Sequence, residues 1–164
     1  MANAPGNVII GLSGASVFSI GSTPTPVGYL EEKSGVALRV EREYVDKRVG
    51  QEVVTIGKTL TSKKAFITAR VAEASLANLV HAFDNVALSG STLTVGSDAE
   101  GEVALSFVGV GPDGSARTVA VPKAVSIGNG ETTYVENGQV VVPLEYEAIG
   151  DPSASGKLLT IVDA

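Results

Sequence analysis

Two segments of alternating hydrophobicity, joined by a long polar stretch, constrain the fold of this chain more than any other feature. Val36, Leu38 and Val40 alternate with less apolar and charged side chains in residues 36–43, and residues 64–72 also alternate. Alternation with a period of two places one face of a β-strand in a core and the other face in water. We therefore expect two half-buried strands at these positions.

The stretch between these strands, residues 44–62, is too long for a tight hairpin turn. It mixes charged residues with β-branched ones and contains a short apolar run at residues 53–56. The stretch is either a pair of short strands or an arm that projects from its two flanking strands. The apolar run accordingly belongs either to a core strand or to a contact that is buried only when another subunit binds.

The second strand pattern runs directly into a short amphipathic helix, which we expect over about residues 74–84. Apolar side chains recur there at the i, i+3, i+4 and i+7 positions of one helical face. A helix of this length is marginal in isolation, so it must pack against a sheet. His81, the only histidine, lies away from the apolar stripe, and we expect it to face solvent.

The composition predicts a single, mainly β domain. The chain has 164 residues, enough for one core, and we expect residues 1–164 to form one domain. It has 19 glycines, no tryptophan and only 5% aromatic residues, so small aliphatic side chains must build the core. Glycines between valine-rich runs indicate many short strands joined by turns. Residues 1–14 are expected to form a flexible N-terminal arm.

Further strands and turns are expected along the rest of the chain. The Asn-Gly pairs at residues 129–130 and 137–138 predict hairpin turns, because type I′ turns need positive φ. Pro122 and Pro143 interrupt strand patterns and indicate edges or bulges. The remaining expected strands cover residues 15–20, 93–95, 102–109, 116–124, 131–136, 139–149 and 157–162.

The net charge of −6 is spread unevenly. Residues 1–97 contain 8 acidic and 9 basic residues, whereas residues 98–164 contain 10 acidic and 3 basic residues. An acidic half repels nucleic acid. The acidic turns either keep a β-protein soluble or form a face of an assembly that must not adhere to DNA.

The sequence contains no membrane or secretion signal that we can identify. The longest apolar run near the N-terminus, residues 8–12, is too short for a signal-peptide core or a membrane span. The absence of cysteine mildly favours synthesis in the cytosol. We therefore expect no membrane partner.

No arrangement of residues predicts catalysis, a cofactor or a metal. A Gly-x-Gly-x-x-Gly match at residues 109–114 precedes a strand pattern, whereas dinucleotide binding needs a helix there. Residues 150–157 resemble a phosphate-binding loop, but Leu158 stands where magnesium binding needs Ser or Thr. Glu145 and Glu147 could form an acid–base pair, but their alternation with apolar residues is more simply that of the wet face of an amphipathic strand. An enzyme is the weakest interpretation.

Residues 28–43, 44–62 and 64–84 together resemble the major tail tube proteins of long-tailed bacteriophages. Residues 28–43 read Gly-Tyr-Leu-Glu-Glu-Lys-Ser-Gly-Val-Ala-Leu-Arg-Val-Glu-Arg-Glu and lead into the polar stretch. Residues 65–79 read Ala-Phe-Ile-Thr-Ala-Arg-Val-Ala-Glu-Ala-Ser-Leu-Ala-Asn-Leu and are similar to the family's passage from strand to helix. The likeness covers about a third of the chain strongly and most of it in outline.

The resemblance implies a β-sandwich or split barrel, with one short helix at about residues 74–84 and a long β-hairpin arm. Six subunits of the family form a ring, and rings stack into a hollow tube that conducts DNA at ejection. Strands 36–43 and 64–72 would line the inner barrel, together with a third strand at residues 139–149. Residues 44–62 would project to the next ring.

The same resemblance implies partners and a location. The chain would bind copies of itself, the tape measure protein and tail-end proteins, and DNA would pass without specific binding. It would be made in the host cytoplasm and end in the virion, as part of the phage tail. No cofactor is implied.

The resemblance also assigns roles to three groups of residues. The arm that contacts the next ring would use Tyr44, Val45, Gln51, Val53, Val54 and Ile56. An acidic lumen would keep DNA from adhering, and the candidates for that wall are Glu41, Glu43, Glu145 and Glu147. The helix would dock through Leu76, Leu79, Val80 and Phe83.

Two alternatives stay open from the sequence. One is another ring-forming virion protein, such as a tail terminator or a capsid decoration subunit. The other is a non-enzymatic β-sandwich module, such as an adhesin or carbohydrate-binding domain. A sugar-binding module needs exposed aromatic side chains, and this chain has no tryptophan and four tyrosines.

Overall fold

The computed structural model describes most of the chain, and most of the described residues lie in strands. The described residues are 18–21, 25–27, 30–31, 35–48, 55–72, 74–83, 86–96, 101–110, 113–128, 130–134, 136 and 140–163. The predicted N-terminal arm at residues 1–14 lies outside them, and so do residues 49–54 at the end of the long hairpin.

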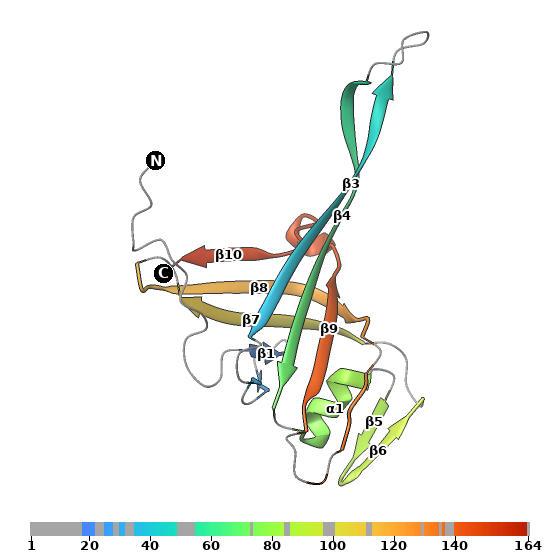
Figure 1. Cartoon of the computed structure of the whole chain (residues 1–164), viewed down its shortest axis with the longest axis vertical. Coiled ribbons are helices and arrows are strands. Elements are labelled where there is room, and N and C mark those ends of the chain that lie inside the picture. The colour runs from blue at the N-terminus through green and yellow to red at the C-terminus, as the bar shows by residue number, and fades with distance from the viewer. Residues whose placement is uncertain are drawn as a thin grey trace.

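One curled antiparallel sheet forms the body of the molecule (Figure 1). A two-stranded sheet and one short helix, α1 (Leu76–Phe83), lie at one end of it. This mainly β, half-barrel architecture with a single helix and a long hairpin confirms the predicted fold class. The strands of the main sheet follow the order β2 (Thr25–Pro26), β1 (Phe18–Ile20), β7 (Glu102–Val110), β8 (Ala116–Ser126), β9 (Val142–Ala148), β4 (Thr55–Val71) and β3 (Val36–Arg48), and the small sheet pairs β5 (Val86–Ser89) with β6 (Thr92–Val95).

The main sheet splits where β8 has two partners along one edge. Residues 124–126 of β8 pair with β9, whereas residues 117–120 pair with β10 (Thr160–Asp163). Beyond the split, β9 continues beside β4 and β3, while β10 stays beside β8 (Figure 1). The sheet is therefore a barrel that is open on one side.

The hairpin of β3 and β4 extends well past the rest of the sheet. The two strands pair from Val36 opposite Ala69 to Arg48 opposite Thr55, but β9 pairs only with residues 65–71 of β4. The outer part of the hairpin therefore has no third strand beside it and projects from the body (Figure 1). The arm is thus a direct continuation of the two strands that the sequence predicts.

The core lies on the inner face of this curled sheet. Ile67 on β4 lies opposite Tyr146 on β9, and both side chains are fully buried together with Leu144. The helix packs on the same face, because the hydroxyl of Tyr146 donates a hydrogen bond of 3.1 Å to the backbone oxygen of His81. Aliphatic residues dominate the buried cluster, as the composition predicts.

The strand predicted at residues 131–136 is wrong, since residues 131–134 and 136 form no strand. The reason is the packing of Gly130 against the end of α1. A Cβ atom at this position would lie 2.5 Å from Phe83 Cδ1 and 2.6 Å from the backbone oxygen of Ala82. Gly130 therefore allows close packing against the helix end, whereas Asn129, the other residue of the predicted turn, lies outside the described residues.

The two prolines that interrupt the predicted strands, Pro122 and Pro143, lie where the hydrogen-bond ladder is interrupted. Pro122 lies in the stretch of β8 where the register against residues 103–105 of β7 shifts. Pro143 pairs with Arg70, but β8 reaches only as far as Tyr146 along β9. The prediction of edges or bulges at Pro122 and Pro143 is confirmed. Strand β5 is an addition to the strands predicted from the sequence.

Candidate assembly surfaces

The outer edge of β3 is the longest unpaired strand edge among the described residues. β3 has 13 residues and pairs with β4 on one side only. The opposite end of the sheet finishes in β2, which has only two residues. A long strand edge with unpaired N–H and C=O groups is a template for another strand, and soluble proteins usually cover or shorten such edges. This edge is therefore suited to pairing with a second chain.

The four lumen candidates all lie on one face of the sheet formed by β3, β4 and β9. Directly opposite residues share a face, and Glu41 lies opposite Lys64 while Glu147 lies opposite Phe66. Glu145 lies opposite Thr68, and Glu43 opposite Ser62. This face points away from the core. The structure thus brings together carboxylates from two distant parts of the sequence.

Two of these carboxylates have cationic partners on the same face. Arg39 Nη2 lies 3.3 Å from Glu41 Oε1, and Lys64 Nζ lies 3.2 Å from Glu147 Oε1. The guanidinium of Arg39 also covers the ring of Phe66, 4.8 Å from its centroid, which helps to bury an aromatic side chain on the outer face. The face therefore carries mixed charge, with the acidic groups in excess.

The projecting arm exposes apolar side chains. Tyr44 lies opposite Leu60, and each of these residues is 47% exposed. Val45 is 56% exposed. The register shifts at this point, and Thr61 Oγ1 donates a 3.1 Å hydrogen bond to the Glu43 backbone oxygen. Exposed apolar groups on a narrow hairpin are stabilised only if a partner covers them.

The other predicted arm residues are less fully described. Ile56 belongs to β4, although the position of its side chain is not described. Gln51, Val53 and Val54 lie outside the described residues. Their contact with a neighbouring ring stays a prediction.

The residues through which the helix contributes to the core overlap only partly with the predicted set, since Leu79 is buried and Phe83 packs against the core. Leu79 is buried, but Leu76 is 36% exposed, and Val80 and Phe83 are half-buried. Asn78 and Ala82 are buried beside Leu79. The docking face is thus rotated relative to the apolar stripe, with Leu76 at its exposed margin.

Two polar side chains that the sequence does not single out fix the position of this helix. Asn78 Nδ2 donates a 2.9 Å hydrogen bond to the backbone oxygen of Val27, which is itself buried. Tyr146 bonds the other end of the helix at His81. Tyr146 could have been recognised in the sequence by its alternation with Leu144 and Ala148, which lie on the inward face of the same strand. Asn78 gave no signal, because an asparagine on a short helix is ordinarily exposed.

His81 is half-buried, so the prediction of a solvent-facing side chain is wrong. Burial lowers the pKa of this imidazole below its ordinary value, because a charged ring is poorly solvated there. His81 is therefore biased toward its neutral form.

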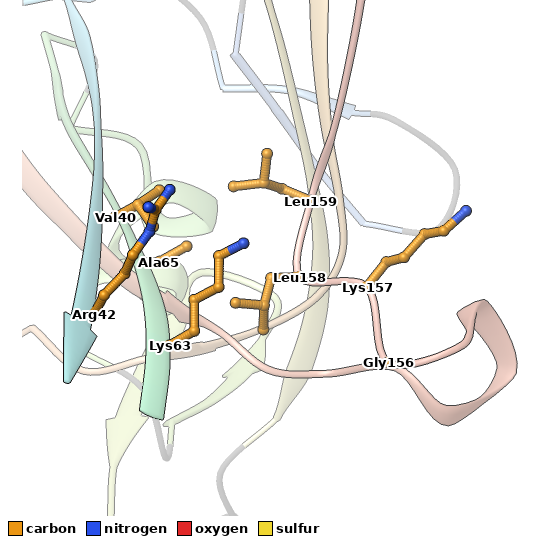
Figure 2. A pocket seen from close by; sticks show the side chains of 8 residues that line it. All are labelled: Val40, Arg42, Lys63, Ala65, Gly156, Lys157, Leu158 and Leu159. Atoms are coloured by element: carbon orange, nitrogen blue, oxygen red, sulfur yellow. The ribbon is translucent and has the colours of Figure 1, made fainter. Parts of the chain in front are cut away.

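A cleft lies in the split of the sheet, between the base of the arm and the segment that leads into β10 (Figure 2). Its volume is about 450 Å³. Three cations line it: Arg42 from β3, Lys63 from β4 and Lys157 from the opposite rim. We refer to this feature as the basic cleft.

Metal and membrane features are absent from the part of the chain that the structure describes. No group of three or more His, Cys, Asp or Glu side chains is arranged there to hold a metal ion. None of the helices found within those same residues has the length and apolar character needed to cross a membrane.

Solved structures of particle proteins resemble this fold. The chain matches a chain from the virion of a native gene transfer agent particle with a TM-score of 0.50 and 11% identity, over 89% of this chain and 94% of that chain. It matches a chain of the sheath–tube complex of an extracellular contractile injection system, PVC, in the extended state, with a TM-score of 0.48 and 12% identity, over 100% and 99%. It also matches a chain of the tube-terminating cap of the anti-feeding prophage, with a TM-score of 0.49 and 12% identity, over 100% and 100%.

This chain shares the fold of a gene transfer agent virion protein. The match extends over nearly all of both chains, so it concerns the whole architecture and not one motif. The resemblance to tail proteins that the sequence indicates is thereby confirmed as a likeness of fold. No family model matches the sequence, and no curated protein matches it.

Proposed function

We propose that this chain is a structural virion protein that assembles into hexameric rings, which stack into the hollow tail tube through which DNA is ejected. The observation that carries the proposal is the open, 13-residue edge of β3 in a half-barrel. The fold shared with a gene transfer agent virion protein supports the same role.

Ring formation satisfies the unpaired edge. A strand from a neighbouring subunit would bond to β3, and closure of the ring would leave no exposed edge. The curled sheets of six subunits would then make one continuous barrel around a channel. Glu41, Glu43, Glu145 and Glu147 would face this channel, since they share the sheet face that points away from the core.

The surroundings of the tube follow from this assignment. The acidic excess on the channel face would let a polyanion slide without phosphate contacts. The tape measure protein would occupy the channel during assembly, and tail-end proteins would cap the tube. The chain would be made in the host cytoplasm and function within the virion, with no enzymatic activity and no cofactor.

Electron microscopy of the purified protein over a range of concentrations tests the proposal. We expect hollow rings with sixfold symmetry and, at higher concentration, tubes of stacked rings. Hydrogen exchange adds a residue-level measurement: the outer amides of β3 should exchange rapidly in subunits and become protected in tubes.

This experiment has three possible outcomes, and each has a different consequence for the proposal. Sixfold tubes support the proposal. A monomer that stays monomeric at every concentration, with unprotected β3 amides, would rule it out and favour a binding module. Rings that never stack would contradict the tube and favour a terminator or decoration subunit.

A further inference from the structure

The basic cleft places two cations directly opposite each other. Arg42 on β3 and Lys63 on β4 are register partners, and both side chains extend to the same side of the hairpin (Figure 2). Neither they nor Lys157 forms an ion pair within the part of the chain that the structure describes. Like charges directly opposite each other destabilise a sheet. The isolated subunit therefore lacks an anion that this arrangement favours.

The absence of a carboxylate here contrasts with the rest of the molecule. Most other described cations, among them Lys64 and Arg70, lie within 4.0 Å of an acidic side chain. The chain as a whole carries a net charge of −6, so acidic groups are plentiful. The cleft is thus a local concentration of unbalanced positive charge in an acidic protein.

The cleft also has an apolar floor. Val40 and Ala65 contribute from the hairpin, and Leu158 and Leu159 face them across the gap (Figure 2). Val40 is 42% exposed, although it belongs to the otherwise inward-facing side of β3. A volume of about 450 Å³ is enough for one large side chain and its neighbours. The chemistry favours a ligand that combines carboxylates with an apolar or aromatic group.

The chain itself contains a segment of this chemistry. Glu131 and Glu136 are exposed and form no ion pair with the described cations. Between them lies Tyr134, whose side chain is 71% exposed, the largest value among the large apolar residues described. We refer to Glu131, Tyr134 and Glu136 as the acidic segment.

The acidic segment and the basic cleft lie toward opposite ends of the subunit. The acidic segment follows Gly130, which packs on the end of α1, and precedes the start of β9 at Val142, opposite Val71. The cleft is eight residues further along β4, at Lys63, which corresponds to roughly 25 Å toward the arm. The basic cleft of one copy can therefore meet the acidic segment of another copy only in a head-to-tail arrangement. Head-to-tail contacts of this kind generate open stacks.

We propose that the basic cleft binds the acidic segment of a second copy of this chain, located in the adjacent ring. Tyr134 of that copy lies on the apolar floor, and its two glutamates balance Arg42 and Lys63, whose side chains extend into the cleft (Figure 2). The proposal rests on the proposed function, because it assumes that rings stack. If the pairing forms, the direction in which rings stack is set by this charge pairing as well as by the arm.

A charge-reversal experiment tests the pairing. The variant R42E/K63E keeps two like charges opposite each other, as in the unmodified chain, so the subunit should fold about as stably. We expect its critical concentration for tube formation to rise about tenfold or more, because carboxylates would then meet Glu131 and Glu136 at the interface. The double variant E131K/E136K should show the same defect, and the combined variant R42E/K63E/E131K/E136K should recover assembly. Sedimentation measures assembly, and circular dichroism verifies folding.

The matched control is R70E, which reverses an exposed cation that pairs with Glu31, seven residues along β4 from Lys63 and on the outward face of the sheet. It should assemble at the unmodified concentration. If the unmodified chain forms no tubes, the proposed function fails. If it forms tubes but R42E/K63E does so equally well, or if the combined variant is not rescued, only the pairing is overturned. Binding of a fluorescent DNA duplex to unassembled subunits, lost in R42E/K63E, would also overturn it in favour of a phosphate site.

Discussion

At the scale of single residues, the position of the helix depends on a few buried polar groups. Asn78 is 5% exposed and donates its amide hydrogen to the carbonyl of Val27, far away in sequence. Leaving such a buried carbonyl without a partner costs about 1–3 kcal/mol. Asn78 therefore links the helix to the segment that follows β2, and no apolar residue could replace this contact.

His81 makes folding stability depend on pH near neutrality. Its pKa is lowered in the folded protein, so the unfolded chain binds a proton more readily. Stability is then greatest above the unfolded pKa of about 6.5 and decreases as the pH falls toward the lowered value. We expect urea unfolding to show a decrease from about pH 7.5 to about pH 5.5 that is smaller in H81Q. Equal decreases in both proteins would contradict this. As a control, the difference in stability between the two proteins should stop changing with pH above about pH 8, where the His81 imidazole is neutral in both the folded and the unfolded state.

At the scale of elements, α1 holds the small second sheet and the chain after β8 against the main sheet. The helix has only eight residues and is not stable alone. Ser75 Oγ accepts a 3.3 Å hydrogen bond from the Asn78 backbone N–H at its N-terminus, and Gly130 packs against its last residues. Its order thus comes from a local cap at its N-terminus, from the Asn78 bond to Val27, and from the packing of Gly130 at its other end.

Substitution of Gly130 by alanine tests how tightly this element is packed. The new Cβ would lie within 3 Å of Phe83 and of the Ala82 backbone oxygen, and a backbone atom cannot move away cheaply. We expect a loss of about 1–3 kcal/mol in the free energy of unfolding. G101A is the matched control, since a Cβ at Gly101 has no atom within 4 Å. If both variants unfold at the same denaturant concentration, the close packing is not essential.

At the scale of the whole molecule, the subunit is an incomplete structure. Its main sheet curls around a core but leaves a long edge open, and its hairpin exposes Tyr44, Val45 and Leu60 away from the body. Both features make sense if neighbouring copies complete the sheet and cover the arm. The basic cleft at the base of the arm follows the same pattern.

Deletion of residues 47–58 tests the arm at this scale. The deleted part lies beyond the residues that pair with β9, so the core is untouched and the subunit should fold. We expect it to remain unassembled in sedimentation and in electron micrographs, because rings lose the contact that projects between them. Replacement of Leu88, an exposed residue on β5, by serine should leave assembly unchanged. Normal tubes from the deleted protein would refute the role of the arm.

Local patterns were sufficient to predict the strands and the helix in the middle of the chain. Alternation identified residues 36–43 and 64–72, and helical periodicity identified residues 74–84, because each pattern depends on near neighbours only. The strand expected at residues 131–136 failed: Gly130, just before it, packs against the end of α1, and a local pattern does not reveal that tertiary contact. The single-domain assignment over residues 1–164, and the assembly roles of the arm and the acidic wall, stay predictions.

The sequence by itself determined that this chain builds β-strands around an aliphatic core and that a long charged hairpin leads into a short helix. Its alternation, glycine content and lack of cysteine specify this through local backbone preferences and burial. Only the tertiary structure decided which strand edge among the described residues stays open and that Arg42 and Lys63 lie side by side at one cleft, with Lys157 on its opposite rim. Strand order and register bring together residues that are far apart in the chain, and such pairing is a property of the whole sheet.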